Sequence, residues 1–277
     1  MSLPTPVAAP AANQWSNLVK VILCAAVAAL LAAPFASAQA ADDEVSQIRS
    51  AGVLKACHAE SLPWAVKDVS SGEWKGSDIL ATQSLADALG VKVEHVDSSW
   101  STLVPNLEAG KCDIIMAPVF RTAERALRVL FTDPTGFVTQ SVGVKADSGL
   151  KTYADLDQPG KTVAVISGTG DESFAKRFFK KATVQSLVTD KVAQVMIEVA
   201  SGRADAFLTD TSTTNIGIHD NSNMNLTVLD PDHPLNPQGY SYAIRKGEYD
   251  FLDFVNVWQS IVKANGDQAS WDAQFAQ

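Results

Sequence analysis

The stretch Lys161-Thr162-Val163-Ala164-Val165-Ile166 is an apolar, strand-like run, and the turn Ser167-Gly168-Thr169-Gly170 follows it. A helical pattern over residues 171–181 comes next. A buried strand that passes through a glycine-containing turn into a helix is one unit of a parallel α/β sheet. This unit predicts the fold class of the whole chain if the same order recurs on either side of it.

The order does recur. Upstream we predict strands over 53–57, 91–96 and 113–117, with a helix over 78–89 that ends at Gly90. Downstream we predict a helix over 191–200, strands over 204–209 and 239–245, and a closing helix that carries Leu252, Val255, Gln259 and Val262. About 235 residues follow residue 41, enough for two α/β lobes that each bury a core.

The N-terminal leader has the pattern of a signal peptide. Lys20 precedes an apolar run over 21–33, and small residues over 36–41 follow it. The run is shorter than the roughly 20 residues that cross a bilayer. We therefore predict a signal peptide over residues 1–40 and a periplasmic protein. Cleavage after Ala38 and cleavage after Ala40 both fit.

The charge and the histidines limit the possible partners. The chain has 22 basic and 31 acidic side chains, a net charge of −9, and such an acidic protein repels the phosphates of nucleic acids. The four histidines lack metal-ligand spacing, and Gly168-x-Gly170 is a weak nucleotide motif. We expect no nucleic acid, no metal and no cofactor.

Two cysteines, Cys57 and Cys112, remain after the leader. An oxidising compartment favours a disulfide between them. However, Cys57 closes the strand over 53–57 and Cys112 opens the parallel strand over 113–117, so they should lie at opposite ends of the sheet, more than about 10 Å apart. We expect two free, buried thiols.

Several motifs in a fixed order resemble bacterial solute-binding protein family 3, the periplasmic amino-acid-binding proteins, over nearly the whole exported chain. They are Gly52-Val53-Leu54, residues 98–107 with Gly110-Lys111-Cys112-Asp113, Thr122-Ala123-Glu124-Arg125, Phe131-Thr132-Asp133-Pro134, Ser167-Gly168-Thr169 and residues 201–206. The resemblance implies a two-lobed periplasmic-binding-protein fold of type II, α/β in class. Each lobe is then a doubly wound, mostly parallel sheet, and two hinge crossovers join them. Lobe 1 would comprise 41–140 plus 243–277, and lobe 2 would comprise 141–242.

The resemblance also implies a ligand site in the cleft, beyond the carboxyl ends of the strands. Arg125 matches the arginine that forks onto the ligand α-carboxylate. Asp210 matches the carboxylate that receives the α-ammonium, with a helix N-cap as the simpler alternative. The expected ligand-binding residues are Ser61, Trp64, Trp100, Ala117, Phe120, Arg125, Gly168, Thr169 and Asp210.

Two positions depart from the family pattern. Phe120 removes a hydroxyl that commonly touches the carboxylate, and Ser61 stands where many members carry an aromatic wall. Trp64, Trp100 and Phe120 could instead enclose an ammonium or a flat cationic ring, as in ectoine binders of this family, or each could be core. His58 and Glu60 could read a ligand side chain or form a solvated loop pair.

The sequence thus predicts a monomeric, non-enzymatic protein that binds a small zwitterion or carboxylate, first of all an amino acid, for an inner-membrane ABC permease. A compatible-solute binder of the ectoine type is one alternative. A cyclohexadienyl-dehydratase-like enzyme is the other, because such enzymes look similar around Asp210 and Tyr240. Those enzymes add an acid shortly after the aspartate, whereas this chain has Ser212, Thr213 and Thr214 there.

Overall fold

The computed structural model describes residues 1–3 and 43–275. The predicted signal peptide falls on residues 1–40, so the peptide beyond residue 3 and both candidate cleavage points lie outside the described residues. In the described part of the chain, no helix combines the length and the apolar character that a membrane span needs.

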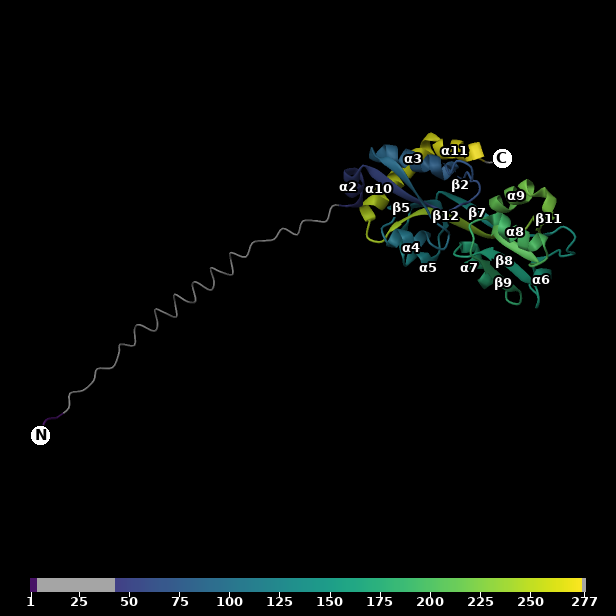
Figure 1. Cartoon of the computed structure of the whole chain (residues 1–277), viewed down its shortest axis with the longest axis horizontal. Helices are drawn as coiled ribbons and strands as arrows, with labels where there is room; N and C mark the ends of the chain where they lie inside the picture. The colour runs from purple at the N-terminus through teal and green to yellow at the C-terminus, as the bar shows by residue number, and fades with distance from the viewer. Residues whose placement is uncertain (4–42, 276–277) are drawn as a thin grey trace. The chain divides into compact units, whose positions relative to one another are not determined.

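Residues 43–275 form an α/β body in which helices cover a ten-stranded sheet (Figure 1). The first elements are α2 (Glu44–Ala51), β1 (Val53–His58), β2 (Val66–Lys67), β3 (Trp74–Lys75), α3 (Ser77–Leu89), β4 (Lys92–Asp97), α4 (Leu103–Glu108), β5 (Ile114–Phe120), α5 (Ala123–Ala126) and β6 (Val129–Phe131). Then come β7 (Gly136–Lys145), α6 (Tyr153–Leu156), β8 (Thr162–Ile166), α7 (Gly170–Phe178), β9 (Thr183–Leu187), α8 (Val192–Ala200), β10 (Ala206–Asp210) and α9 (Thr211–Asp220). The last are the short 3₁₀ helix Ser222–Met224, β11 (Leu226–Leu229), β12 (Leu235–Arg245), α10 (Tyr249–Asn265) and α11 (Asp267–Phe275).

The strand order β4-β1-β5-β12-β7-β10-β8-β9 places two parallel sets at the two ends of the sheet. β1 pairs in parallel with β4 and β5, and β8 pairs in parallel with β9 and β10. The long strands β7 and β12 run antiparallel to their neighbours and join the sets. We call the elements α2 to β6 with α10 and α11 the first lobe, β8 to β11 the second lobe, and β7 and β12 the crossover strands.

Each lobe has a core on both faces of its sheet, because successive residues of a strand point to opposite sides. On β5, Ile114 and Met116 pack with α3 and α10, whereas Ile115 packs with α4. On β8, Val163 faces one core of the second lobe and Ala164 the other. The α/β, doubly wound expectation is confirmed. The lobe boundaries at residues 140 and 243 stay a prediction; they fall within the crossover strands.

The prediction of two free cysteines is wrong, because Cys57 and Cys112 form a disulfide with a Cα–Cα distance of 5.7 Å. The parallel strands are staggered, so that Cys57 lies opposite Ile115. β5 then continues to Phe120, past the end of β1. The start of β5 therefore lies beside the end of β1. The prediction assumed that the two strands begin level with one another.

Candidate ligand-binding site

A cavity of about 220 Å³ lies between the lobes and takes its walls from both. Of the expected residues, those that line it are Ser61, Trp64, Trp100, Phe120, Arg125, Thr169 and Asp210. They lie at or just after the carboxyl ends of strands β1, β4, β5, β8 and β10. The tertiary structure thus brings together side chains that are up to 149 positions apart, from Ser61 to Asp210.

Two expected residues do not line this cavity. Ala117 is fully buried in the core of the first lobe, and the next residue, Pro118, lines the cavity instead. The alternation of side chains along β5 explains the difference. Gly168 offers its carbonyl oxygen to Arg125 and, with φ of +82°, approaches Ser101 so closely that an added Cβ would lie 2.6 Å from Cα of Ser101. Ala117 therefore lies in the core of the first lobe, and Gly168 lies at a contact between the lobes.

Arg125 lies in the short helix α5, which Thr122 caps. Its Nη1 donates to the carbonyl of Phe120 at 3.1 Å, and its Nη2 donates to the carbonyl of Gly168 in the other lobe at 2.7 Å. Burial lowers the pKa of the guanidinium and the charge of Asp171 raises it. A guanidinium has five N–H donors, so donors remain for a carboxylate in the cavity.

Asp210 is both a helix N-cap and a residue of the cavity. It is the N-cap of α9, where one carboxylate oxygen accepts from the backbone N–H of Thr213 at 2.9 Å. It also lines the cavity, and its side chain is buried. Burial raises the pKa of Asp210 to about 6, because a carboxylate loses hydration there. An ammonium group in the cavity would restore its ionised form.

Asp171 is a cavity residue that sequence reasoning missed. It lies in the first turn of α7, directly after Gly170, and is buried. Its Oδ1 accepts from Nε2 of Gln140 on β7 at 2.5 Å. Burial and the charge of Asp210 raise its pKa to about 7. Asp171 could have been suspected from the sequence, because it begins a helix that follows the strand and turn over 161–170. The sequence did not show that its side chain points into the cavity.

The three aromatic residues expected at the site all line the cavity. Trp64 packs edge-on against Tyr240, with ring centroids 5.5 Å apart. Nε1 of Trp100 donates to the carbonyl of Glu60 at 3.0 Å. Phe120 lies against Gly170, where an added Cβ would come within 2.5 Å of its ring. Gly170 therefore leaves room for the phenyl ring at the start of α7.

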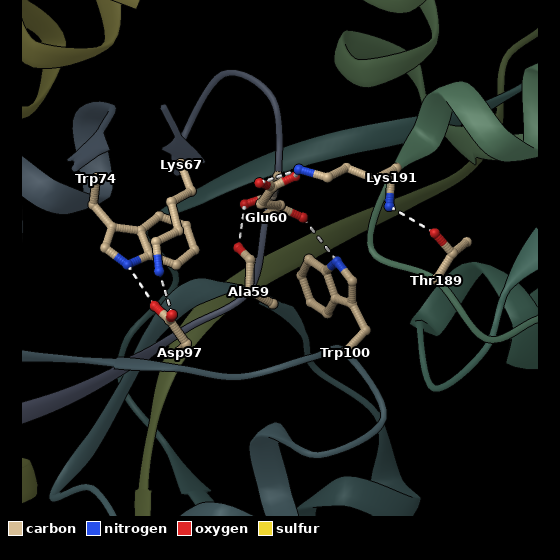
Figure 2. A network of polar contacts seen from close by, with 9 residues as sticks. Ala59, Glu60, Lys67, Trp74, Asp97, Trp100, Thr189 and Lys191 are labelled. Atoms are coloured by element: carbon tan, nitrogen blue, oxygen red, sulfur yellow. Dashed lines mark hydrogen bonds and ion pairs between the residues drawn. The ribbon is translucent and has the colours of Figure 1, made fainter. Parts of the chain in front are cut away.

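Polar contacts join the two lobes around the cavity. Figure 2 shows the carboxylate of Glu60 in the first lobe paired with the ammonium of Lys191 in the second. The backbone N–H of Trp100 donates to Oδ1 of Asp190 at 3.1 Å. Together with the bond from Arg125 to Gly168, these contacts hold the two cavity walls against one another.

His58 is not part of the cavity. It is fully buried, and its ring contacts the carbonyl of Met116 at 2.9 Å and the ring of His95 at 3.0 Å. Burial lowers its pKa to about 3, so it is neutral. Glu60, from the same loop, does line the cavity. Over residues 1–3 and 43–275, no group of three or more His, Cys, Asp or Glu side chains is placed to hold a metal ion.

The charges that line the cavity are mainly negative. Five carboxylates stand against two cations, Arg125 and Lys191, and the carboxylates are those of Glu60, Asp171, Asp190, Asp210 and Asp220. Lys191 is already paired with Glu60. The cavity therefore favours a ligand with more positive than negative charge.

The chain belongs to the bacterial extracellular solute-binding proteins, family 3, which match residues 54–277. This result confirms the resemblance that the sequence motifs carried. A cyclohexadienyl dehydratase of Pseudomonas aeruginosa is 27% identical over 257 residues, which are 92% of each chain.

Two solved structures are similar in fold. The ancestral amino-acid-binding protein AncCDT-1, described as a precursor of cyclohexadienyl dehydratase, is 32% identical with a TM-score of 0.75 and covers 85% of this chain and 100% of its own. A putative ABC-transporter binding component from Wolinella succinogenes, complexed with lysine, is 32% identical with a TM-score of 0.74 and covers 81% and 95%.

Proposed function

We propose that this protein captures an amino acid with a cationic side chain in the periplasm and delivers it to an inner-membrane ABC permease. The observation that carries the proposal is the cavity between the lobes, in which one half-buried arginine faces an excess of carboxylates. An α-carboxylate requires a cation, and an α-ammonium and a side-chain cation require anions. The cavity offers both kinds of partner, with anions in excess of cations.

The roles of the individual residues follow from this arrangement. Arg125 and the first turn of α7 at Thr169 bind the α-carboxylate, since both the guanidinium and the helix N-terminus favour an anion. Asp210 binds the α-ammonium. Trp64, Trp100 and Phe120 enclose the rest of the ligand, where a desolvated cation–π contact is worth up to about 2 kcal/mol.

The similar proteins support this ligand class. One is complexed with lysine, and another is described as an ancestral amino-acid-binding protein. An ectoine binder would need the same aromatic walls but would leave most of the cavity carboxylates without partners. That imbalance favours a cationic amino acid over a compatible solute.

Calorimetry with arginine, lysine, citrulline, serine and ectoine tests the proposal. Citrulline is the matched control, because it resembles arginine in shape but lacks the side-chain charge. We expect arginine or lysine to bind with a Kd of about 1 μM or below, and citrulline to bind at least about tenfold more weakly. Equal binding of citrulline and arginine, or tightest binding of serine or ectoine, would contradict the proposal.

We propose a binding protein rather than a dehydratase, although one relative carries that enzyme name. After Asp210 the chain has Thr213, and its hydroxyl donates to the carbonyl of Leu62 at 2.9 Å. The acidic cavity is also unsuited to substrates with several carboxylates. An assay with cyclohexadienyl acids should give no turnover, and measurable product formation would overturn this part of the proposal.

The lobes over 41–140 with 243–277 and over 141–242 should move as two bodies about the crossover strands, in a single monomeric chain. The contacts of Glu60 with Lys191 and of Trp100 with Asp190 then form on closure. Solution scattering with and without arginine tests this motion, and the same data give the molecular mass. Identical curves, or the mass of a dimer, would count against it.

A further inference from the structure

Asp171 is the buried acidic residue of the cavity to which the proposed roles give no task. It and Asp210 line the same cavity and are 7% and 8% exposed. They come from different elements, since Asp171 opens α7 and Asp210 ends β10, and these two elements pack against one another. The cavity therefore presents two carboxylates from two directions.

Gln140 determines how Asp171 presents its carboxylate. The side-chain Nε2 of Gln140 donates to Oδ1 of Asp171 at 2.5 Å, while Oε1 of Gln140 accepts from Nδ2 of Asn236 at 3.0 Å. Nδ2 of Asn236 also donates to Oε1 of Gln238 at 3.0 Å, and Nε2 of Gln238 donates to the carbonyl of Arg121 at 2.9 Å. Side chains of both crossover strands thus hold one oxygen of Asp171, and the residue itself lines the cavity.

Few cationic side chains lie near the carboxylates of Asp171 and Asp210. Arg125 is the cation that acts on Asp171, and a ligand carboxylate would occupy that guanidinium. The neighbouring Glu172 is already paired with Lys176, and Glu60 with Lys191. The remaining charged groups that line the cavity are the carboxylates of Asp190 and Asp220.

We propose that Asp171 is a second ammonium-binding carboxylate and that the α-ammonium of the ligand lies between Asp171 and Asp210. The inference rests on the proposed function. An ammonium that bonds to both carboxylates must carry N–H donors, so quaternary ammonium compounds are rejected. This requirement also separates amino acids from betaines.

Ligand capture is then linked to a proton. In the empty cavity the pKa of Asp171 is raised to about 7 and that of Asp210 to about 6, so the pair holds a proton near neutral pH. A bound ammonium favours the ionised form of both groups, and the displaced proton goes to solvent. Because the pKa is higher in the protein without a bound ammonium than in the complex, affinity is full well above the pKa of Asp171 and falls as the pH is lowered through that pKa.

Calorimetry with arginine at about pH 8 and about pH 6 tests the inference. We expect wild type to bind about tenfold more weakly at the lower pH and to release up to about one proton per ligand. Asp171→Asn should bind about tenfold more weakly than wild type at about pH 8 and should lose most of the pH dependence. Its thermal stability at that pH should equal or exceed that of wild type, since a buried like-charge repulsion is removed.

Two further variants sharpen the test. Asp87→Asn removes one exposed charge from α3, away from the cavity, and should bind like wild type. Gln140→Leu removes the donor that lowers the pKa of Asp171. The loss of affinity with falling pH should therefore begin at a higher pH in this positioning variant, a change that a merely structural role would not produce.

If Asp171→Asn binds arginine within threefold of wild type with an unchanged pH profile, the inference is overturned. If neither arginine nor lysine binds wild type, the proposed function fails, and methylammonium becomes the probe. NMR titration of the Asp171 carboxyl then decides: a titration midpoint that methylammonium moves to lower pH supports the second ammonium site. A midpoint that methylammonium leaves unchanged overturns it.

Discussion

The two lobes contribute different chemistry to the same cavity. The first lobe supplies its aromatic walls: Trp64 and Trp100 come from loops that follow β1 and β4, and Phe120 is the last residue of β5. The second lobe supplies Asp171 and Asp210 at the starts of α7 and α9. Aromatic enclosure therefore comes from the first lobe, which has a disulfide in its core, whereas both lobes supply charged groups. The site is complete only where residues of the two lobes meet.

The largest expected effect comes from Arg125, which lies in the first lobe and bonds to the second. Arg125→Ala should weaken arginine binding by about 2–5 kcal/mol, because a buried charge-assisted contact is lost. Calorimetry measures the effect. Arg128→Ala is the matched control, since Arg128 is exposed and pairs with Glu108. Binding by Arg125→Ala within threefold of wild type would show that Arg125 serves only to hold the lobes together.

Loss of the disulfide in the first lobe should have the next largest effect, on stability rather than on ligand affinity. Replacing both Cys57 and Cys112 with serine opens a covalent loop with a sequence separation of 55 and should lower the free energy of unfolding by about 2–4 kcal/mol. Denaturant unfolding of the variant and of wild type measures the change. Arginine affinity at a temperature where the variant is folded should stay near that of wild type. Equal unfolding midpoints would contradict the prediction.

Substitutions of Phe120 test how much the aromatic walls of the first lobe contribute to ligand binding. Phe120→Ser should weaken binding of a cationic amino acid by about 1–2 kcal/mol, because both the π face and the packing against Gly170 are lost. Phe120→Leu keeps most of the apolar contact and removes the π face alone. Calorimetry on both variants therefore separates the two contributions. A neutral Phe120→Ser variant with improved binding of serine would favour a polar amino acid as the natural ligand.

The smallest expected effect belongs to the ion pair between Glu60 and Lys191. The Lys191 side chain is 50% exposed, and exposed ion pairs are worth about 0–1 kcal/mol. Lys191→Gln should raise the dissociation rate of arginine by no more than about fivefold, and added salt should shrink the difference. Stopped-flow measurements at low and high ionic strength check this. An effect as large as that of Arg125→Ala would mean that closure, rather than recognition, dominates affinity.

Much of the fold could be read from local patterns, because hydrophobic periodicity and glycine stops depend on neighbouring residues alone. The helix predicted over 78–89 is observed as α3, and the strand predicted over 161–166 is observed as β8. The short strands β9 and β11 were not predicted. Such short strands depend on pairing with other strands, β8 for β9 and β7 for β11.

What the sequence determined by itself is the α/β class, the family and several residues of the cavity, among them Arg125 and Asp210. Only the tertiary structure decided the pairing of Cys57 with Cys112, because the stagger of parallel strands is set by packing between them. The tertiary structure likewise decided that Ala117 lies in the core and that Asp171 lines the cavity. Local sequence specifies which residues form a strand or a helix, whereas the direction of a side chain into a shared cavity depends on how two distant segments meet.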